Sequence, residues 1–180
     1  DKLLWMNGVY LRSIEDIDLA GRLLKVLTDS LPTDIKRPIS LDYVKEIVPL
    51  VRERMKTLQD AQDNMGFFFT ENITYDGNDL IQRGVNKSQT IDLLKRASSV
   101  LLVLDDWTDS NIETALRSLV HETGFKAGQL FGSLRIAVTG RRIAPPLFTT
   151  MAVLRSERCI ARLKHAIHIL KQVDDTDDSI

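Results

Sequence analysis

The 180-residue sequence has few of the features that mark an enzyme, a secreted protein or a membrane protein. Its single cysteine permits neither an intrachain disulfide nor a zinc site with several cysteines, and fits a reducing compartment. It has no run of about 18 apolar residues, so no helix is expected to span a membrane. Glycine-rich phosphate loops and the G-x-S-x-G motif are absent, and no side chains suggest acid–base catalysis. We therefore expect a cytoplasmic domain without catalytic residues.

Two further absences concern the ends of the chain and metals. The first residues, DKLLWMNGVYLR, have neither the basic start nor the apolar core of a signal peptide, and they lack an initiator Met. We therefore expect a fragment of a longer protein. His165 and His168 can share a helix face, but the chain has only one other histidine and no carboxylate is clearly paired with them. No metal site is expected.

Positive charge is concentrated in one part of the chain, although the formal net charge is only −1. Residues 121–172 carry nine Lys and Arg against two Glu, whereas residues 173–180 carry four Asp. A basic third of a chain suits a polyanionic partner. The acidic end is expected to be a disordered tail.

Apolar residues recur mostly at helical spacing, and clear two-residue alternation is absent. The predicted buried stripes are Ile17, Ala20, Leu24 and Leu27; Val44, Ile47, Val48 and Val51; Leu94, Ala97, Leu101 and Leu104; Ile112, Ala115, Leu116 and Leu119; Leu130, Leu134 and Val138; and Ile160, Leu163, Ile167 and Leu170. The apolar run VLLVL at 100–104 could also be a buried strand by periodicity alone.

These stripes predict an all-α fold of roughly nine to eleven helices without a substantial sheet. The polar, glycine-containing residues 70–86 separate two groups of helices. We therefore predict two consecutive small helical subdomains, residues 1–75 and 76–172, followed by the acidic tail 173–180. Ser13 and Ser40 are predicted helix N-caps, and Gly140 is a predicted C-cap with positive φ.

The predicted core includes two features that could be mistaken for functional sites. Phe67–Phe69 is the densest aromatic cluster and could stack on bases, but it is more typical of a core. Cys159 lies on the apolar side of the last predicted helix, so we expect a packed small residue.

The stretch LRIAVTGRRIAPPLF, residues 134–148, carries the main candidate site. It predicts a helix, a connector with arginines and two prolines, and a second helix. Guanidinium groups around a rigid connector suit a flexible polyanion such as nucleic acid. A solvated basic turn on a helical domain is the alternative.

Arg54 is the second candidate. Its spacing from Ile47 and Val51 predicts a side chain close to the buried stripe, at a seam between elements. There it can pack its stem and pair internally, or reach a ligand. Arg52 is predicted to point toward solvent instead.

Five segments in order match one family. DKLLWMNGVYLR is similar to K-L-x-W-x-N-G-x-Y-I-R, RERMKTLQDAQDNMGFFF to R-x-R-x-x-T-L with a following aromatic cluster, and LRIAVTGRRIAPPLF to P-L-R-x-A-L-T-G-x-x-x-x-P-x-L-F. DDWT before an amphipathic helix, and SERCIARLKHAI for G-K-E-R-x-x-x-R-L, extend the match over about residues 2–171. The chain thus resembles the C-terminal anticodon-binding region of bacterial glutamyl-tRNA synthetases. It departs from the pattern at Ser133, where Pro is usual, and at Arg155-Ser156, where Gly-Lys is usual.

The resemblance implies an all-helical region of two small domains that recognises splayed anticodon bases. Arg54 matches the arginine that recognises the last anticodon base, a cytosine, and relaxed family members often carry Gln there. Positions around the other bases are matched by Arg135, Ala144, Pro145 and Leu147; Ala144 replaces a Thr. Further candidates for RNA backbone contacts are Arg141, Arg142 and Arg158.

The resemblance also implies a parent enzyme that attaches glutamate to tRNA(Glu) using ATP and Mg²⁺. Both class I signatures, of the H-I-G-H and K-M-S-K-S types, are absent from this chain, so it is expected to hold no catalytic residue, cofactor or metal. The expected partner is tRNA(Glu), and a monomer is expected. A helical protein-interaction or regulatory module without an RNA role is the alternative.

Overall fold

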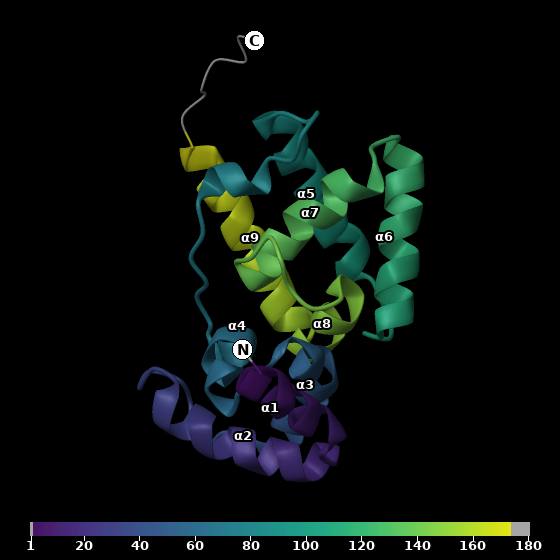
Figure 1. The fold of residues 1–180 in the computed structure, drawn as a ribbon. Coiled ribbons are helices and arrows are strands. Elements are labelled where there is room, and N and C mark those ends of the chain that lie inside the picture. Colours follow the sequence, from purple (N-terminus) through teal and green to yellow (C-terminus); the bar gives the residue numbers. More distant parts are fainter. Residues whose placement is uncertain (1, 174–180) are drawn as a thin grey trace. The chain divides into compact units, whose positions relative to one another are not determined.

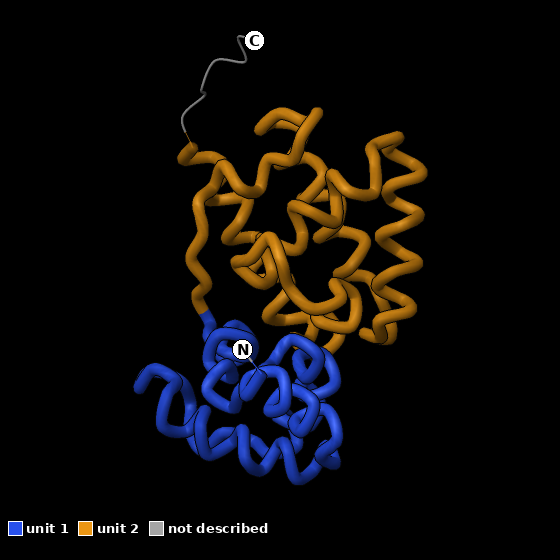
Figure 2. Tube along the Cα trace, viewed as in Figure 1, with its two compact units in different colours: residues 1–71 blue, residues 72–180 orange. Residues whose placement is uncertain are grey.

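The computed structural model describes residues 2–173, and the chain divides into two compact units, residues 1–71 and 72–180 (Figures 1 and 2). Over the described residues it contains nine α-helices, three short 3-10 helices and no strand. The predicted all-α fold is confirmed, and the ambiguous run at 100–104 lies at the end of a helix rather than in a strand. No helix within residues 2–173 is long and apolar enough to cross a membrane. The acidic tail lies, except for residue 173, outside the described residues.

Unit 1 is built around α2, which packs against α3 and α4. Its elements are α1 (Lys2–Ser13), α2 (Asp16–Ser30), α3 (Leu41–Val51), η1 (Arg52–Arg54), η2 (Leu58–Asp60) and α4 (Ala61–Phe69). The α3 stripe forms as predicted, with all four residues fully buried. Ser40 caps α3 as predicted, because its side chain accepts a hydrogen bond from the Tyr43 N–H at 3.3 Å.

One local prediction in unit 1 is partly wrong and another is wrong. Ala20 and Leu27 of the predicted α2 stripe are buried, but Ile17 is 52% exposed and Leu24 partly exposed, and the buried face is completed by Leu19 and Leu23. Residues 16–27 contain two overlapping apolar stripes, and packing against α3 and α4 selects one of them. Ser13 is not an N-cap: it is the last residue of α1, and its hydroxyl donates to the Tyr10 carbonyl at 2.8 Å. Glu15 occupies the N-cap position of α2 instead.

The aromatic cluster of unit 1 belongs to the core, as predicted. Phe68 is fully buried and stacks against Phe67, with ring centroids 4.3 Å apart. Phe69 lies at the edge of the core and makes an edge-to-face contact with Tyr43 at 5.5 Å. Two of the three rings are therefore unavailable for stacking on a base.

Unit 2 packs α5 and α7 along α9, and α6 against α5 and α8 (Figure 1). Its elements are η3 (Gly77–Leu80), α5 (Lys87–Leu102), α6 (Asp109–Thr123), α7 (Ala127–Thr139), α8 (Leu147–Leu154) and α9 (Ser156–Gln172). Fully buried residues fill the space between these helices, among them Leu94, Ala97, Ile112, Leu116, Leu130, Leu134, Met151 and Leu163. Cys159 is also fully buried, as predicted.

Arg155 joins α8 to α9 in a conformation that suits glycine. Its φ of 71° and ψ of 160° make it the one non-glycine residue with positive φ among the described residues. This region is populated almost only by glycine, and an L-residue there costs on the order of 1–3 kcal/mol. The family pattern has Gly at this position, so the replacement of that Gly by Arg155 is expected to reduce the stability of the fold.

Arg155→Gly is therefore expected to raise the free energy of unfolding by about 1 kcal/mol, after subtraction of the greater freedom of Gly in the unfolded chain. Thermal denaturation followed by circular dichroism measures the effect. Arg142→Gly is the matched control, because Arg142 has no positive φ and should gain nothing. An equal or lower melting temperature for Arg155→Gly would contradict the strain assigned to this residue.

Candidate nucleic-acid interface

The connector of residues 140–146 begins where α7 is stopped by Gly140. Gly140 has a φ of 72°, and its N–H donates to the Ile136 carbonyl at 2.8 Å, which closes the last turn of the helix. A Cβ added at Gly140 would lie 3.4 Å from the Thr74 carbonyl oxygen, which is an ordinary contact distance, so the connector passes close to residues 73–75. The predicted C-cap is confirmed, and the left-handed conformation favours glycine here.

The Thr139 hydroxyl fixes the first residues of the connector. It donates to the Arg135 carbonyl at 2.6 Å and accepts a hydrogen bond from the Arg141 N–H at 3.2 Å. One side chain thus joins the last turn of α7 to the first arginine of the connector. Sequence reasoning assigned no role to Thr139, although a Thr directly before a C-capping Gly can form such bonds.

Fewer of the predicted site residues in and next to the connector face solvent than the resemblance implies. Arg142 is exposed, and Arg141 and Ala144 are partly exposed, but Pro145 and Leu147 are buried. Ile143, which sequence reasoning did not single out, is 80% exposed. Pro145 and Leu147 therefore hold the connector against the rest of unit 2, whereas residues 141–144 form the outer surface of the connector.

Arg142 forms an ion pair that a phosphate can replace. Its guanidinium lies 2.5 Å from a carboxylate oxygen of Asp79 in η3. The Arg142 side chain is largely exposed, and such surface pairs contribute only about 0–1 kcal/mol. Loss of this ion pair therefore costs little stability. The other candidate arginines of unit 2, Arg135 on α7 and Arg158 on α9, are partly exposed.

A buried arginine lies beneath the connector. Arg162 on α9 is only 3% exposed, and its Nη1 donates to the Val138 carbonyl in the last turn of α7. Burial raises the pKa of the neighbouring Cys159 thiol to about 12, although the positive charges of Arg162 and Arg158 oppose this shift. In the sequence, Arg162 contributed to the count of basic residues and to the match of the last family segment, but helical periodicity does not reveal a buried charge.

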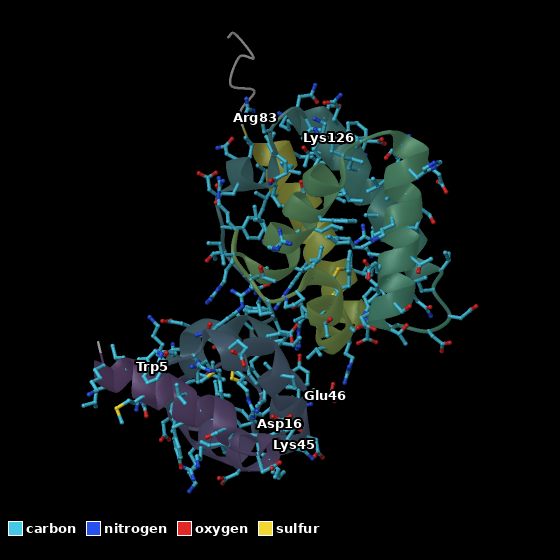
Figure 3. All side chains as sticks on the ribbon, turned by 45° about the vertical axis from the view of Figure 1, so that its right-hand side comes forward. Trp5, Asp16, Lys45, Glu46, Arg83 and Lys126 are labelled. Carbon is cyan, nitrogen blue, oxygen red and sulfur yellow. The ribbon has the colours of Figure 1, made fainter. Side chains whose placement is uncertain are left out.

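The structure reverses the predicted placement of Arg52 and Arg54. Arg52, expected in solvent, is half-buried and lies 2.5 Å from Asp16, which Figure 3 labels in unit 1. Arg52 also donates to the Ile14 carbonyl at 2.8 Å. Arg54, expected at a seam, is exposed. The cause is that α3 ends at Val51 and continues as the tighter turn η1, so helical spacing no longer applies.

The η1 turn nevertheless holds Arg54 firmly. The residues on either side, Val51 and Met55, are 0% and 1% exposed, and the Met55 N–H donates to the Arg52 carbonyl at 3.2 Å. Arg54 is thus an exposed guanidinium on a short turn with two buried ends. Such a turn can present a side chain to a ligand in a fixed orientation.

The described residues contain no group of three or more His, Cys, Asp and Glu that could hold a metal ion. The outer surface of the connector, residues 141–144, offers two guanidinium groups and two apolar side chains. This chemistry suits binding of a polyanion.

The fold and the arginine-bearing connector define an all-helical domain with a candidate surface for nucleic acid. The chain belongs to the family described as "Anticodon binding domain", whose model matches residues 18–167. A glutamate–tRNA ligase of Dehalococcoides mccartyi is 38% identical over 96% of this chain, and one of Roseiflexus sp. is 40% identical over 92%. The chain spans about a third of the length of these relatives, 36% and 33% respectively.

A solved structure has the same fold. The crystal structure of a glutamate tRNA ligase from Elizabethkingia meningosepticum matches 92% of this chain and 31% of its own, with a TM-score of 0.79. At 21% sequence identity, this likeness concerns the fold alone.

Proposed function

We propose that this chain is the anticodon-binding part of a glutamate–tRNA ligase and that it binds tRNA(Glu) through the anticodon. The observation that carries the proposal is the family match over residues 18–167, which includes the Arg54 turn and the connector. The parent enzyme would attach glutamate to tRNA(Glu) with ATP and Mg²⁺, both bound by a catalytic domain outside this stretch. We further propose a cytoplasmic monomer.

Arg54 would recognise the last anticodon base. A guanidinium can donate two hydrogen bonds to the O2 and N3 acceptors on the Watson–Crick edge of a cytosine, whereas the same edge of guanine offers one acceptor, O6, beside two donors. Anticodon bases that are splayed out of the loop present these edges freely. The exposed position of Arg54 on a turn with buried ends supports this role.

The connector would contact the other anticodon bases and the backbone around them. Arg142 and Arg141 would bind phosphates, and the exposed Ile143 and the partly exposed Ala144 would lie against bases. Pro145 and Leu147 would act from the interior, by supporting the connector. Arg135 and Arg158 are further candidates for RNA contacts.

The 180-residue chain is expected to bind a tRNA(Glu) transcript more tightly than the same transcript with a substituted anticodon. Binding should be weak, because the chain has a net charge of only −1, and it should weaken with salt as counterions are released at Lys and Arg contacts. A gel shift with both transcripts at low and at physiological salt measures both effects. Equal affinities for the two transcripts would refute anticodon recognition, and a flat salt dependence would refute the phosphate contacts.

A helical protein-interaction module without an RNA role is the second candidate. It is favoured by the apolar side chains that α1 exposes, among them Leu3 and Trp5, which are 84% and 66% exposed (Figure 3). Such residues are typical of a surface that another protein covers. The gel shift separates the two candidates, because this module predicts no preference between the transcripts.

A further inference from the structure

We propose that Arg162 is a positioning residue for RNA recognition: it fixes the direction in which the connector of residues 140–146 leaves α7. This inference rests on the proposed function, because it concerns how the connector meets the anticodon loop. Arg162 itself would touch no RNA.

The burial of Arg162 calls for a physical reason. Arg162 is only 3% exposed, and it is the one buried charged residue among the residues that the structure describes. A charge inside a protein is costly unless its hydrogen-bonding groups are used. Arg162 uses Nη1 to bond the Val138 carbonyl, at the carboxyl end of α7, where the helix dipole is negative. One donor of the buried guanidinium therefore stabilises the end of α7.

That helix end is where the connector begins. Three interactions converge on it: the Gly140 N–H bonds the Ile136 carbonyl, the Thr139 hydroxyl bonds the Arg135 carbonyl, and Arg162 bonds the Val138 carbonyl. The first two come from α7 and the connector themselves. Arg162 comes from another helix, so its bond ties this end of α7 directly to α9.

The path of the chain makes this bond a cross-link. After α7 the chain runs through the connector and α8 and returns in α9, which packs against both α7 and α8. Arg162, in the second turn of α9, bonds back to the last turn of α7. The bond thus links the two residues that flank the segment 139–161, Val138 and Arg162. If the bond is lost, the connector is still attached at both ends, but the end of α7 loses this link to α9.

Salt dependence distinguishes a positioning role from a direct contact. An arginine that binds a phosphate contributes to counterion release, so its loss reduces the slope of log K against log salt by about 0.7–0.9. Arg162 is buried and cannot bind a phosphate. Its replacement should therefore weaken binding and leave this slope unchanged.

The test compares Arg162→Met and Arg162→Lys with the unmutated 180-residue chain. Arg162→Met is expected to weaken binding of the tRNA(Glu) transcript about tenfold, because small displacements of binding groups are costly, with an unchanged salt slope. Binding of the anticodon-substituted transcript should change little. Arg162→Lys keeps the charge and a donor, so it should recover part of the loss. If Arg162→Met does not fold, Arg162→Lys is judged by the same criteria, with a loss of about threefold.

Leu94→Ala is the control for general destabilisation. Leu94 is fully buried in α5, which packs along α9, and it takes no part in the three hydrogen bonds at the end of α7. Affinities are compared at a temperature at which circular dichroism shows every variant folded. The inference is overturned if the Arg162 variants lose no more affinity than Leu94→Ala, lose it equally for both transcripts, or change the salt slope. If the unmutated chain does not distinguish the transcripts, the proposed function itself fails.

Discussion

Replacement of Arg54 by Gln is expected to reduce the preference of the chain for tRNA(Glu) over tRNA(Gln) by about 1–3 kcal/mol, a factor of about 5 to 150. The last anticodon base is cytosine in the first tRNA and guanine in the second. A guanidinium donates a pair of charged hydrogen bonds to cytosine, whereas the Gln amide is neutral and also offers an acceptor. The fold should survive, because Arg54 is exposed and its turn is held by the buried Val51 and Met55.

The measurement is the ratio of dissociation constants for the two transcripts. Arg22→Gln is the matched control, because Arg22 is an exposed arginine of unit 1 that pairs with Asp18, four residues away on the same helix, and lies over the Tyr10 ring. It removes the same charge without touching η1, so the ratio should not change. An unchanged ratio for Arg54→Gln would mean that another residue recognises this base.

Arg52→Gln is expected to lower the free energy of unfolding by about 2–3 kcal/mol, although it lies only two residues from Arg54. The substitution breaks the 2.5 Å ion pair with Asp16 and the 2.8 Å hydrogen bond to the Ile14 carbonyl. These contacts join the end of α3 to the chain between α1 and α2. Discrimination between transcripts should be retained by the fraction of molecules that remains folded.

Urea denaturation followed by circular dichroism measures this loss. Arg54→Gln serves as the control, because an exposed substitution is usually within about 0.5 kcal/mol of neutral. The solvent-facing position predicted for Arg52 from the sequence would instead imply little loss of stability. A midpoint for Arg52→Gln equal to that of the unmutated chain would show that its contacts add no stability.

The contrast between these two arginines shows where sequence reasoning stops. The period of 3.6 residues correctly predicted the buried stripe of α3 as far as Val51. It failed at the next residue, because η1 has three residues per turn and rotates the following side chains. Periodicity can predict the faces of a regular helix, but it does not predict where that regularity ends.

The connector was predictable in its backbone and less so in its side chains. Gly140 was identified because a left-handed C-cap needs a residue without Cβ. The burial of Pro145 and the exposure of Ile143 depend on which way the connector turns against unit 2, and hydrophobicity alone suggests neither. Arg162 was overlooked because its partner is a backbone carbonyl 24 residues away. No local pattern in the sequence records such a pairing.

The burial of Cys159 has a practical consequence for work on this chain. It is the only cysteine in the sequence, it lies in unit 2, and its thiol is fully protonated at neutral pH because burial raises its pKa to about 12. A thiol reagent can therefore modify the chain only when unit 2 opens. The rate of that modification reports the opening of unit 2 separately from events in unit 1, without any introduced label.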